Sequence, residues 1–294
     1  MSTAVPGRQA TWPMPAPPAR PYAEAMTRSL AYFTDLALRR HEGSVVTREG
    51  TLTVIRSPQN QGFWWGNFLL MPAPPLPGDL DRWETQFQNH HSAAHHRAFG
   101  VDTPDGNEGA ADDFRAAGYQ VMHDTVLTAE VTHPPRRLNT DATFRPLATE
   151  ADWASAHALR MAVNAADPSG HEETGYREFS TLKLASYRRA QEAGHGALLG
   201  AFDDTGTMLC GLGIFDAGEG VARYQSVETH PEARSRGLAG TLVHTAAAWA
   251  REHLGTRTLV IVADPNYHAQ ALYESVGFTA TEVQLAIQKR PAGD

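Results

Sequence analysis

The sequence lacks several features that would assign the protein to other classes. It has one cysteine in 294 residues, Cys210, so no disulfide can form within the chain. No run of about 18 or more apolar residues occurs, so we expect no membrane partner. No block of Lys and Arg occurs and the net charge is -8, which argues against binding to nucleic acid. The N-terminus has no basic start followed by an apolar core, and we therefore expect a cytoplasmic protein.

The composition that remains is that of a globular protein. Hydrophobic residues make up 41% of the chain and charged residues 20%, which is close to the average for such proteins. The length is sufficient for two domains of ordinary size. Cys210 lies in the apolar segment MLCGLGIF, where we expect it to be a small buried side chain.

Proline and polar residues divide the chain into four segments. Residues 1–21 are rich in Pro and are expected to form a disordered arm, and residues 136–141 are expected to be a linker. The linker separates a first domain, 22–135, from a second, 142–294. In the first domain, hydrophobic spacing predicts a helix over 22–40 and an apolar strand over 63–71. Helices and strands alternate in the second domain, which predicts a mixed sheet with helices on its faces.

Two motifs in the second domain carry most of the functional information. The first is R-x-x-G-x-A at residues 234–239, where a predicted strand ends and a predicted helix begins. The first amides of a helix have no partner within it and attract anions, and a pyrophosphate suits such a site. The second motif is N-x-x-A-x-x-L-Y-x-x-x-G-F, formed by Asn266, Ala269, Leu272, Tyr273, Gly277 and Phe278.

Together the two motifs resemble the cofactor-binding motifs of the GNAT superfamily of N-acetyltransferases. The resemblance implies an α/β (α+β) fold with two tandem GNAT-like domains, each a mixed, largely antiparallel twisted sheet flanked by helices. It also implies acetyl-CoA as co-substrate and Tyr273 as the general acid that protonates the departing thiolate. The residues implied in cofactor binding are Val227 and Thr229 for the pantetheine arm, Arg234, Arg236, Gly237, Leu238, Ala239, Gly240 and Thr241 for the pyrophosphate, and Asn266 and Tyr273.

The sequence does not identify the general base clearly. If the strand at 221–229 is regular, Arg223 and Gln225 face the site, and neither suits the role. Glu228 would then point to the opposite face, but a β-bulge in the strand would turn it inward. Glu228 is therefore our candidate base, with His230 and solvent as the alternatives that remain open.

The chain also repeats itself at a constant offset. Asn266 and Asn107 are 159 residues apart, and the same offset relates Gly277 to Gly118 and Pro231 to Pro72. In the first copy, Pro75, Pro77 and Asp79 replace Arg234, Arg236 and Leu238, and Phe114 replaces Tyr273. Because Pro lacks an N–H donor and a carboxylate repels phosphate, we expect a degenerate first copy that does not bind the cofactor.

The predicted activity is direct transfer of an acetyl group to a primary amine on a small molecule or peptide. Two alternatives remain: an acyl-CoA sensor without catalytic activity, and a transferase for a longer acyl group. We expect a monomer or homodimer. No metal is expected, because the cluster of His90, His91, His95 and His96 has no Cys or carboxylate at a spacing that completes a tetrahedral site.

Overall fold

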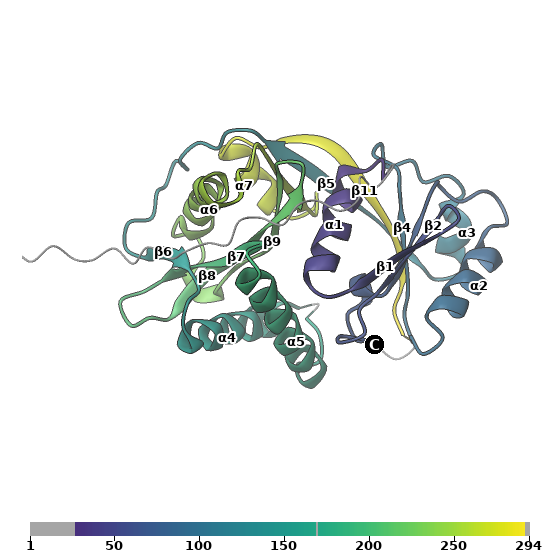
Figure 1. Cartoon of the computed structure of the whole chain (residues 1–294), viewed down its shortest axis with the longest axis horizontal. Helices are drawn as coiled ribbons and strands as arrows, with labels where there is room; N and C mark the ends of the chain where they lie inside the picture. Colours follow the sequence, from purple (N-terminus) through teal and green to yellow (C-terminus); the bar gives the residue numbers. More distant parts are fainter. Residues whose placement is uncertain (1–26, 169, 292–294) are drawn as a thin grey trace, which may run out of the picture.

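The computed structural model describes residues 27–168 and 170–291, so the predicted arm at 1–21 lies outside the described residues. The first repeat comprises α1 (Leu30–His41), β1 (Val45–Glu49), β2 (Leu52–Arg56), η1 (Trp64–Gly66), β3 (Phe68–Met71), α2 (Leu80–His90), β4 (Arg97–Val101), α3 (Ala111–Ala116) and β5 (Gln120–Ala129). The second comprises β6 (Thr143–Pro146), α4 (Glu150–Ala166), α5 (Glu173–Glu192), β7 (Gly196–Phe202), β8 (Met208–Gly218), β9 (Val221–Thr229), η2 (Pro231–Ala233), α6 (Leu238–Leu254), β10 (Thr258–Ala263), α7 (Ala269–Ser275) and β11 (Thr279–Lys289). Figure 1 shows the two repeats side by side, with α1 between them.

The strands form one continuous sheet of eleven strands in the order β1-β2-β3-β4-β11-β5-β10-β9-β8-β7-β6. All neighbouring strands are antiparallel except the pairs β3–β4 and β9–β10, which are parallel. Helices α4 and α5 pack beside the second half of the sheet on one side, and α6 and α7 on the other (Figure 1). The predicted fold class, a mixed and largely antiparallel sheet flanked by helices, is confirmed.

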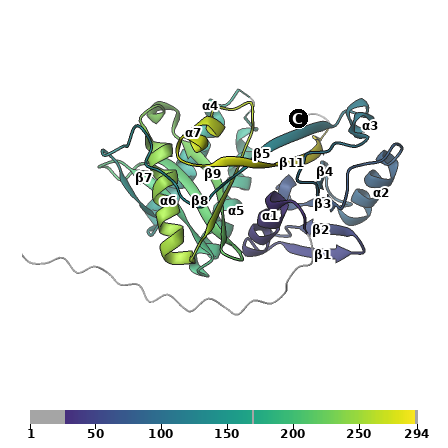
Figure 2. The same ribbon diagram turned by 90° about the horizontal axis from the view of Figure 1, so that it is seen from above.

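The last strand of each repeat lies beside the sheet of the other repeat. β11 pairs with β4 of the first repeat, and β5 pairs with β10 of the second. β5 and β11 also pair with each other, and they run together between the two halves in Figure 2. Their first residues, Gln120 and Thr279, are separated by the same offset of 159 residues that relates the two motif copies. The sheet therefore runs through both predicted domains without a break. The domain bounds, with a linker at 136–141, remain a prediction.

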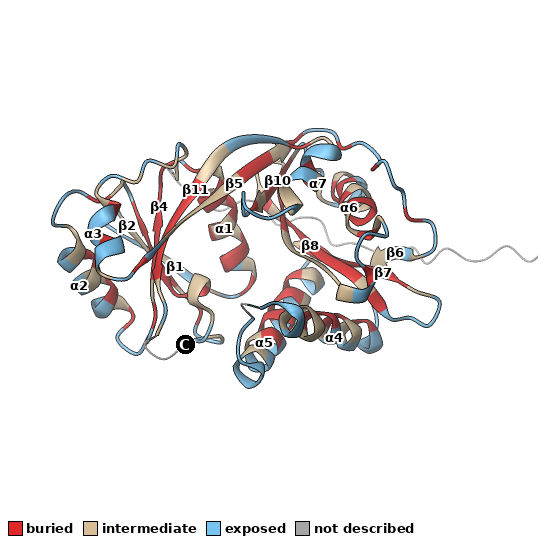
Figure 3. Cartoon of the chain, turned by 180° about the vertical axis from the view of Figure 1, so that it is seen from behind, coloured by how far each residue is buried: buried red, intermediate tan, exposed pale blue. Residues whose placement is uncertain are grey.

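The hydrophobic cores follow this exchange of strands. Leu127 and Ala129 of β5 are buried in the core of the second repeat, with α6 and α7. Leu285 and Ile287 of β11 are fully buried in the core of the first repeat, with α2 and α3. Figure 3 shows buried residues on part of each of these strands, as well as on β4, β8 and α1. Since burying a Leu or Ile side chain stabilises a protein by about 1.5–3 kcal/mol, each repeat depends on the strand that the other contributes.

Two predicted elements differ from the structure. The helix predicted over 22–40 begins only at Leu30 in the described residues, because the Asp102 carboxylate accepts the N–H groups of Arg28 and Ser29 and fixes the chain before the helix. The strand predicted over 63–71 covers only Phe68–Met71. Before it, the side chain of Asn67 donates to the carbonyl groups of Asn60 and Phe63 and holds Trp64–Gly66 in a 3-10 turn.

Candidate active site

The parallel strands β9 and β10 are paired over only part of their length. Their register runs from Val221 opposite Thr258 to Arg223 opposite Val260 and ends there. β9 nevertheless continues to Thr229 and leads directly into the loop at 230–237. Over residues 224–229 the backbone of β9 is therefore not paired with β10, and a ligand with amide groups can bond to it.

A β-bulge at Ser226 determines where the Glu228 side chain points. Gly211 and Gly213 of β8 lie opposite Glu228 and Gln225, so β9 has one more residue than β8 in this interval. Ser226 takes a φ of 50°, in the left-handed region that non-glycine residues seldom adopt. The bulge changes the alternation of side chains, and Glu228 faces α4 and lines a cavity there together with Ser226.

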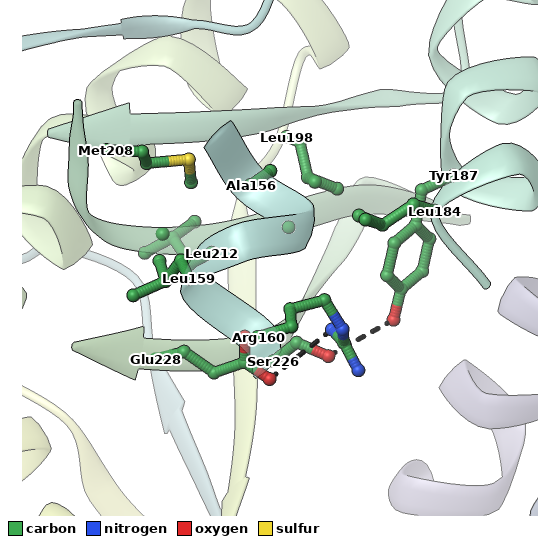
Figure 4. Close-up of a pocket in the computed structure, with 12 residues that line it drawn as sticks. Ala156, Leu159, Arg160, Leu184, Tyr187, Leu198, Met208, Leu212, Ser226 and Glu228 are labelled. Atoms are coloured by element: carbon green, nitrogen blue, oxygen red, sulfur yellow. Dashed lines mark hydrogen bonds and ion pairs between the residues drawn. The ribbon is translucent and has the colours of Figure 1, made fainter. Parts of the chain in front are cut away.

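The carboxylate of Glu228 forms an ion pair at the sheet side of α4. Its Oε1 lies 3.3 Å from Nη1 of Arg160, whose Nε donates to Ser180 Oγ at 3.1 Å. The hydroxyl of Tyr187 lies 3.3 Å from Ser226 Oγ beside this pair, as Figure 4 shows. Burial raises the pKa of Glu228 above its usual value, and the charge of Arg160 partly opposes that rise. A carboxyl group with a raised pKa is a stronger proton acceptor once it is ionised.

Tyr273 lies on the other side of the sheet, in the core formed with α6. Its side chain is buried together with Cys210 of β8. The thiol of Cys210 lies 3.3 Å from Thr229 Oγ1, so Thr229 points to the Tyr273 side and the preceding Glu228 to the α4 side. Burial raises the pKa of Tyr273, which keeps its hydroxyl protonated and able to donate a hydrogen bond. Cys210 is fully buried, as predicted.

Residues 234–241, which comprise the end of the loop at 230–237 and the first turn of α6 and are called the 234–241 loop below, have the geometry of an anion site. Arg234 follows the 3-10 turn η2, Ser235 and Gly237 take φ values of 59° and 77°, and α6 begins at Leu238. Gly237 at the N-cap provides no side chain that caps the helix. Among the described residues, the structure gives no hydrogen-bond partner to the backbone N–H groups of residues 236–240. The side chains of Arg234 and Arg236 are exposed beside these amides, so the residues fit a phosphate group.

The remaining predicted cofactor residues have different environments. Leu238 is buried in the core, and Val227 and Ala239 pack against that core. The hydroxyl of Thr241 donates to the carbonyl of Gly237 at 2.8 Å, so its side chain stabilises the first turn of α6. Asn266 donates from its backbone and side chain to Asp264 Oδ1, at 2.8 and 3.2 Å, in the turn before α7. Its predicted contact with the cofactor remains a prediction.

The corresponding region of the first repeat differs in its strand pairing and in the backbone N–H groups of its loop. β3 and β4 stay paired to their last residues, Met71 and Val101, and the N–H of the next residue, Asp102, donates to Met71 O at 2.9 Å. The N–H of Gly78, the counterpart of Gly237, donates to the Asp113 carboxylate at 3.2 Å. A protein carboxylate therefore occupies the position at which a phosphate would bind.

Sequence reasoning missed the partners of Glu228. Arg160 lies on α4, and Tyr187, which contacts the neighbouring Ser226, lies on α5; the sequence predicted helices in both segments without identifying either residue as functional. Within residues 27–168 and 170–291, no group of three or more His, Cys, Asp or Glu side chains is arranged to hold a metal ion. None of the helices in this part of the chain is long and apolar enough to cross a membrane.

Comparison with known proteins agrees with this geometry. Residues 157–278 match the model of the acetyltransferase (GNAT) family. No curated protein matches the chain. Among solved structures, a GCN5-related N-acetyltransferase from Kribbella flavida is similar with a TM-score of 0.62 and 14% identity, over 90% of this chain and 97% of that one.

Two further structures are similar over most of the chain. A functionally unknown conserved protein from Staphylococcus epidermidis has a TM-score of 0.64 and 14% identity, over 83% of this chain and 93% of that one. A tandem GNAT protein from the clavulanic acid biosynthesis pathway has a TM-score of 0.53 and 11% identity, over 91% of this chain and 94% of that one. Residues 157–278 are thus a domain that matches the GNAT acetyltransferase family, and this match supports acyl-CoA-dependent acetyl transfer in general.

Proposed function

We propose that the protein is an acetyl-CoA-dependent N-acetyltransferase that transfers the acetyl group directly to a primary amine. The observation that carries the proposal is the combination, at one end of β9, of free amides in the 234–241 loop with a buried carboxylate, Glu228, five residues after the last residue of β9 that pairs with β10. The amides suit the pyrophosphate of acetyl-CoA, and the unpaired backbone at 224–229 suits its pantetheine amides.

In the proposed reaction the amine nitrogen attacks the thioester carbonyl, so that a C–N bond forms and the C–S bond breaks. Glu228 accepts the proton that the amine loses, and the raised pKa of its carboxyl suits that role. Tyr273 donates a hydrogen bond or a proton to the departing sulfur from the opposite side of the sheet. Its hydroxyl remains protonated because burial raises its pKa. The products are the acetylated amine and the free thiol.

The alternative is a protein that binds acyl-CoA without transferring the acyl group. The ion pair between Arg160 and Glu228 favours it, because a paired carboxylate accepts a proton less readily. Turnover of acetyl-CoA distinguishes the two functions, since only a transferase releases the thiol in the presence of an amine. If the transferred acyl group is longer than acetyl, a longer acyl-CoA will react faster than acetyl-CoA.

The experiment combines purified protein with acetyl-CoA and a panel of primary amines, from small diamines to peptide N-termini, and follows the release of free thiol. We expect at least one amine to raise thiol release well above the rate without acceptor. If acetyl-CoA binds and no amine raises the rate, the transferase proposal is wrong and the sensor alternative remains.

A further inference from the structure

The segment between the two repeats packs directly on the 234–241 loop. Asn139, which is only 7% exposed, donates from its backbone N–H to Thr241 Oγ1 at 2.9 Å. Its side-chain amide donates to the carbonyl of Arg236 at 3.0 Å. The guanidinium of Arg137 donates to the carbonyl of Ser235. The segment that joins the repeats is thus part of the surroundings of the loop.

Two of these bonds hold peptide planes of the loop. They engage the carbonyl oxygens of Ser235 and Arg236, and these carbonyls belong to the same peptide planes as the N–H groups of Arg236 and Gly237. In a trans peptide the C=O and N–H bonds point in opposite directions. A donor that holds the carbonyl on the linker side therefore directs the N–H away from the linker, toward the side on which a phosphate can bind.

Gly237 shows how closely the linker approaches. A Cβ atom added to Gly237 would overlap the carbonyl oxygen of Arg137, and one added to Gly240 would lie 3.0 Å from Cβ of Pro135. Gly237 thus permits close contact with the linker, and Gly240 permits close contact with Pro135 just before it, as well as the approach of a phosphate. The loop is enclosed on its carbonyl side.

The side chain of Asn139 is oriented by its own turn. Its Oδ1 accepts the backbone N–H groups of Asp141 and Ala142 at 3.2 and 3.0 Å. With the oxygen held there, the Nδ2 group is directed at Arg236. Asn139 therefore has acceptor and donor contacts that an aspartate would reproduce only in part, since a carboxylate keeps the acceptors and loses the donor.

We propose that Asn139 is a positioning residue for acetyl-CoA binding, which holds the peptide planes of the 234–241 loop so that their N–H groups face the pyrophosphate. The inference rests on the proposed function. It assigns to the segment between the repeats a direct part in cofactor affinity, although Asn139 itself does not touch the cofactor.

The test compares Asn139→Asp with Leu138→Asp. The first variant removes the donor to Arg236 and adds a negative charge, whereas the second adds the same charge at an exposed neighbour whose apolar side chain forms no hydrogen bond with the loop. We expect Asn139→Asp to raise the KM for acetyl-CoA and the Kd for CoA about tenfold more than Leu138→Asp does, with kcat unchanged at saturation. With S-acetylpantetheine, which has no pyrophosphate, both variants should match the wild type.

Three results would overturn the proposal: equal effects of the two variants, an equal loss with S-acetylpantetheine, or a change confined to kcat. Thermal unfolding of each variant verifies that the fold is kept, and Asn139→Ser, which keeps a short acceptor but cannot reach Arg236, serves as the second variant. If both Asn139 variants fail to fold, the residue has a structural role and the proposal is wrong. A wild-type protein that binds no CoA would instead refute the proposed function.

Discussion

Oε1 of Glu228 lies 3.3 Å from Nη1 of Arg160, in a mostly buried position between β9 and α4. The bulge at Ser226 makes this contact possible, since it sets the direction of the Glu228 side chain. The pair combines two opposing influences on the carboxyl group, because burial raises its pKa and the guanidinium lowers it. Burial is the larger influence, and the pH dependence of the reaction follows from it.

Glu228→Gln removes the proposed base while keeping the shape of the side chain. The ionised carboxylate is the active form, so kcat/KM of the wild type should fall as the pH drops through a pKa above the ordinary 4.5. In the variant we expect a loss of about 10²-fold and no acid limb of this kind. The pH profile of kcat/KM measures both, with Glu232→Gln, an exposed neighbour, as control. An acid limb that persists unchanged in Glu228→Gln would exclude Glu228 as the base.

Tyr273→Phe removes a hydroxyl and leaves the ring in the core. We expect kcat to fall by about 10²-fold, because the departing thiolate loses its proton donor, while the KM for acetyl-CoA changes little. Tyr267→Phe is the matched control, since Tyr267 is 51% exposed in the preceding turn. If kcat of the Tyr273 variant equals that of the control, the acid role is wrong.

Gly237→Ala tests the close packing at the start of α6. The left-handed φ of 77° costs a non-glycine residue about 1–2 kcal/mol, and the added Cβ would also overlap the Arg137 carbonyl. Gly206→Ala isolates the first effect, since Gly206 has a φ of 83° and nothing within 4 Å of its added Cβ. We expect the Gly237 variant to lose more unfolding free energy than the Gly206 variant in urea titrations and to bind acetyl-CoA more weakly. Equal losses, with affinity for acetyl-CoA retained, would show that the linker does not constrain the loop.

The second repeat, produced alone as residues 142–294, should not fold. Its β10 would lose β5 as a neighbour, its core would lose Leu127, and β11 would lose both of its partner strands. We expect a circular dichroism spectrum without a cooperative thermal transition. A folded and monomeric fragment that binds acetyl-CoA would show that the exchanged strands are dispensable.

The motifs predicted the loop and the position of Tyr273 because their information is local. A left-handed φ at a helix start favours glycine at that one position, so the residue type alone indicates it, as at Gly237. The exchange of β5 and β11 between the repeats has no comparable local signal in the sequence. The two strands occupy the same place in their repeats, and the pattern of apolar residues in each suits the sheet of either repeat. The sequence therefore does not show which repeat each strand completes.

The sequence allowed a β-bulge that turns Glu228 inward, but it could not show that the bulge forms or which residues surround the carboxylate. A regular strand would have turned its side chain away from α4, and the bulge occurs at Ser226, a residue type that does not favour a left-handed φ. The cost is met by contacts from distant parts of the chain, including the hydroxyl of Tyr187 at 3.3 Å. Likewise, Asn139 lies in a segment that composition identified only as a linker, and its function depends on a loop about a hundred residues away.

The most direct test of the account is the stoichiometry of acetyl-CoA binding, measured by isothermal titration calorimetry on the full chain. The account predicts one molecule per chain, because the 234–241 loop has free amides and the Gly78 amide is occupied by Asp113. It also predicts that Gly237→Ala weakens this binding and that Gly78→Ala leaves it unchanged. Two molecules per chain, or none, would contradict the account.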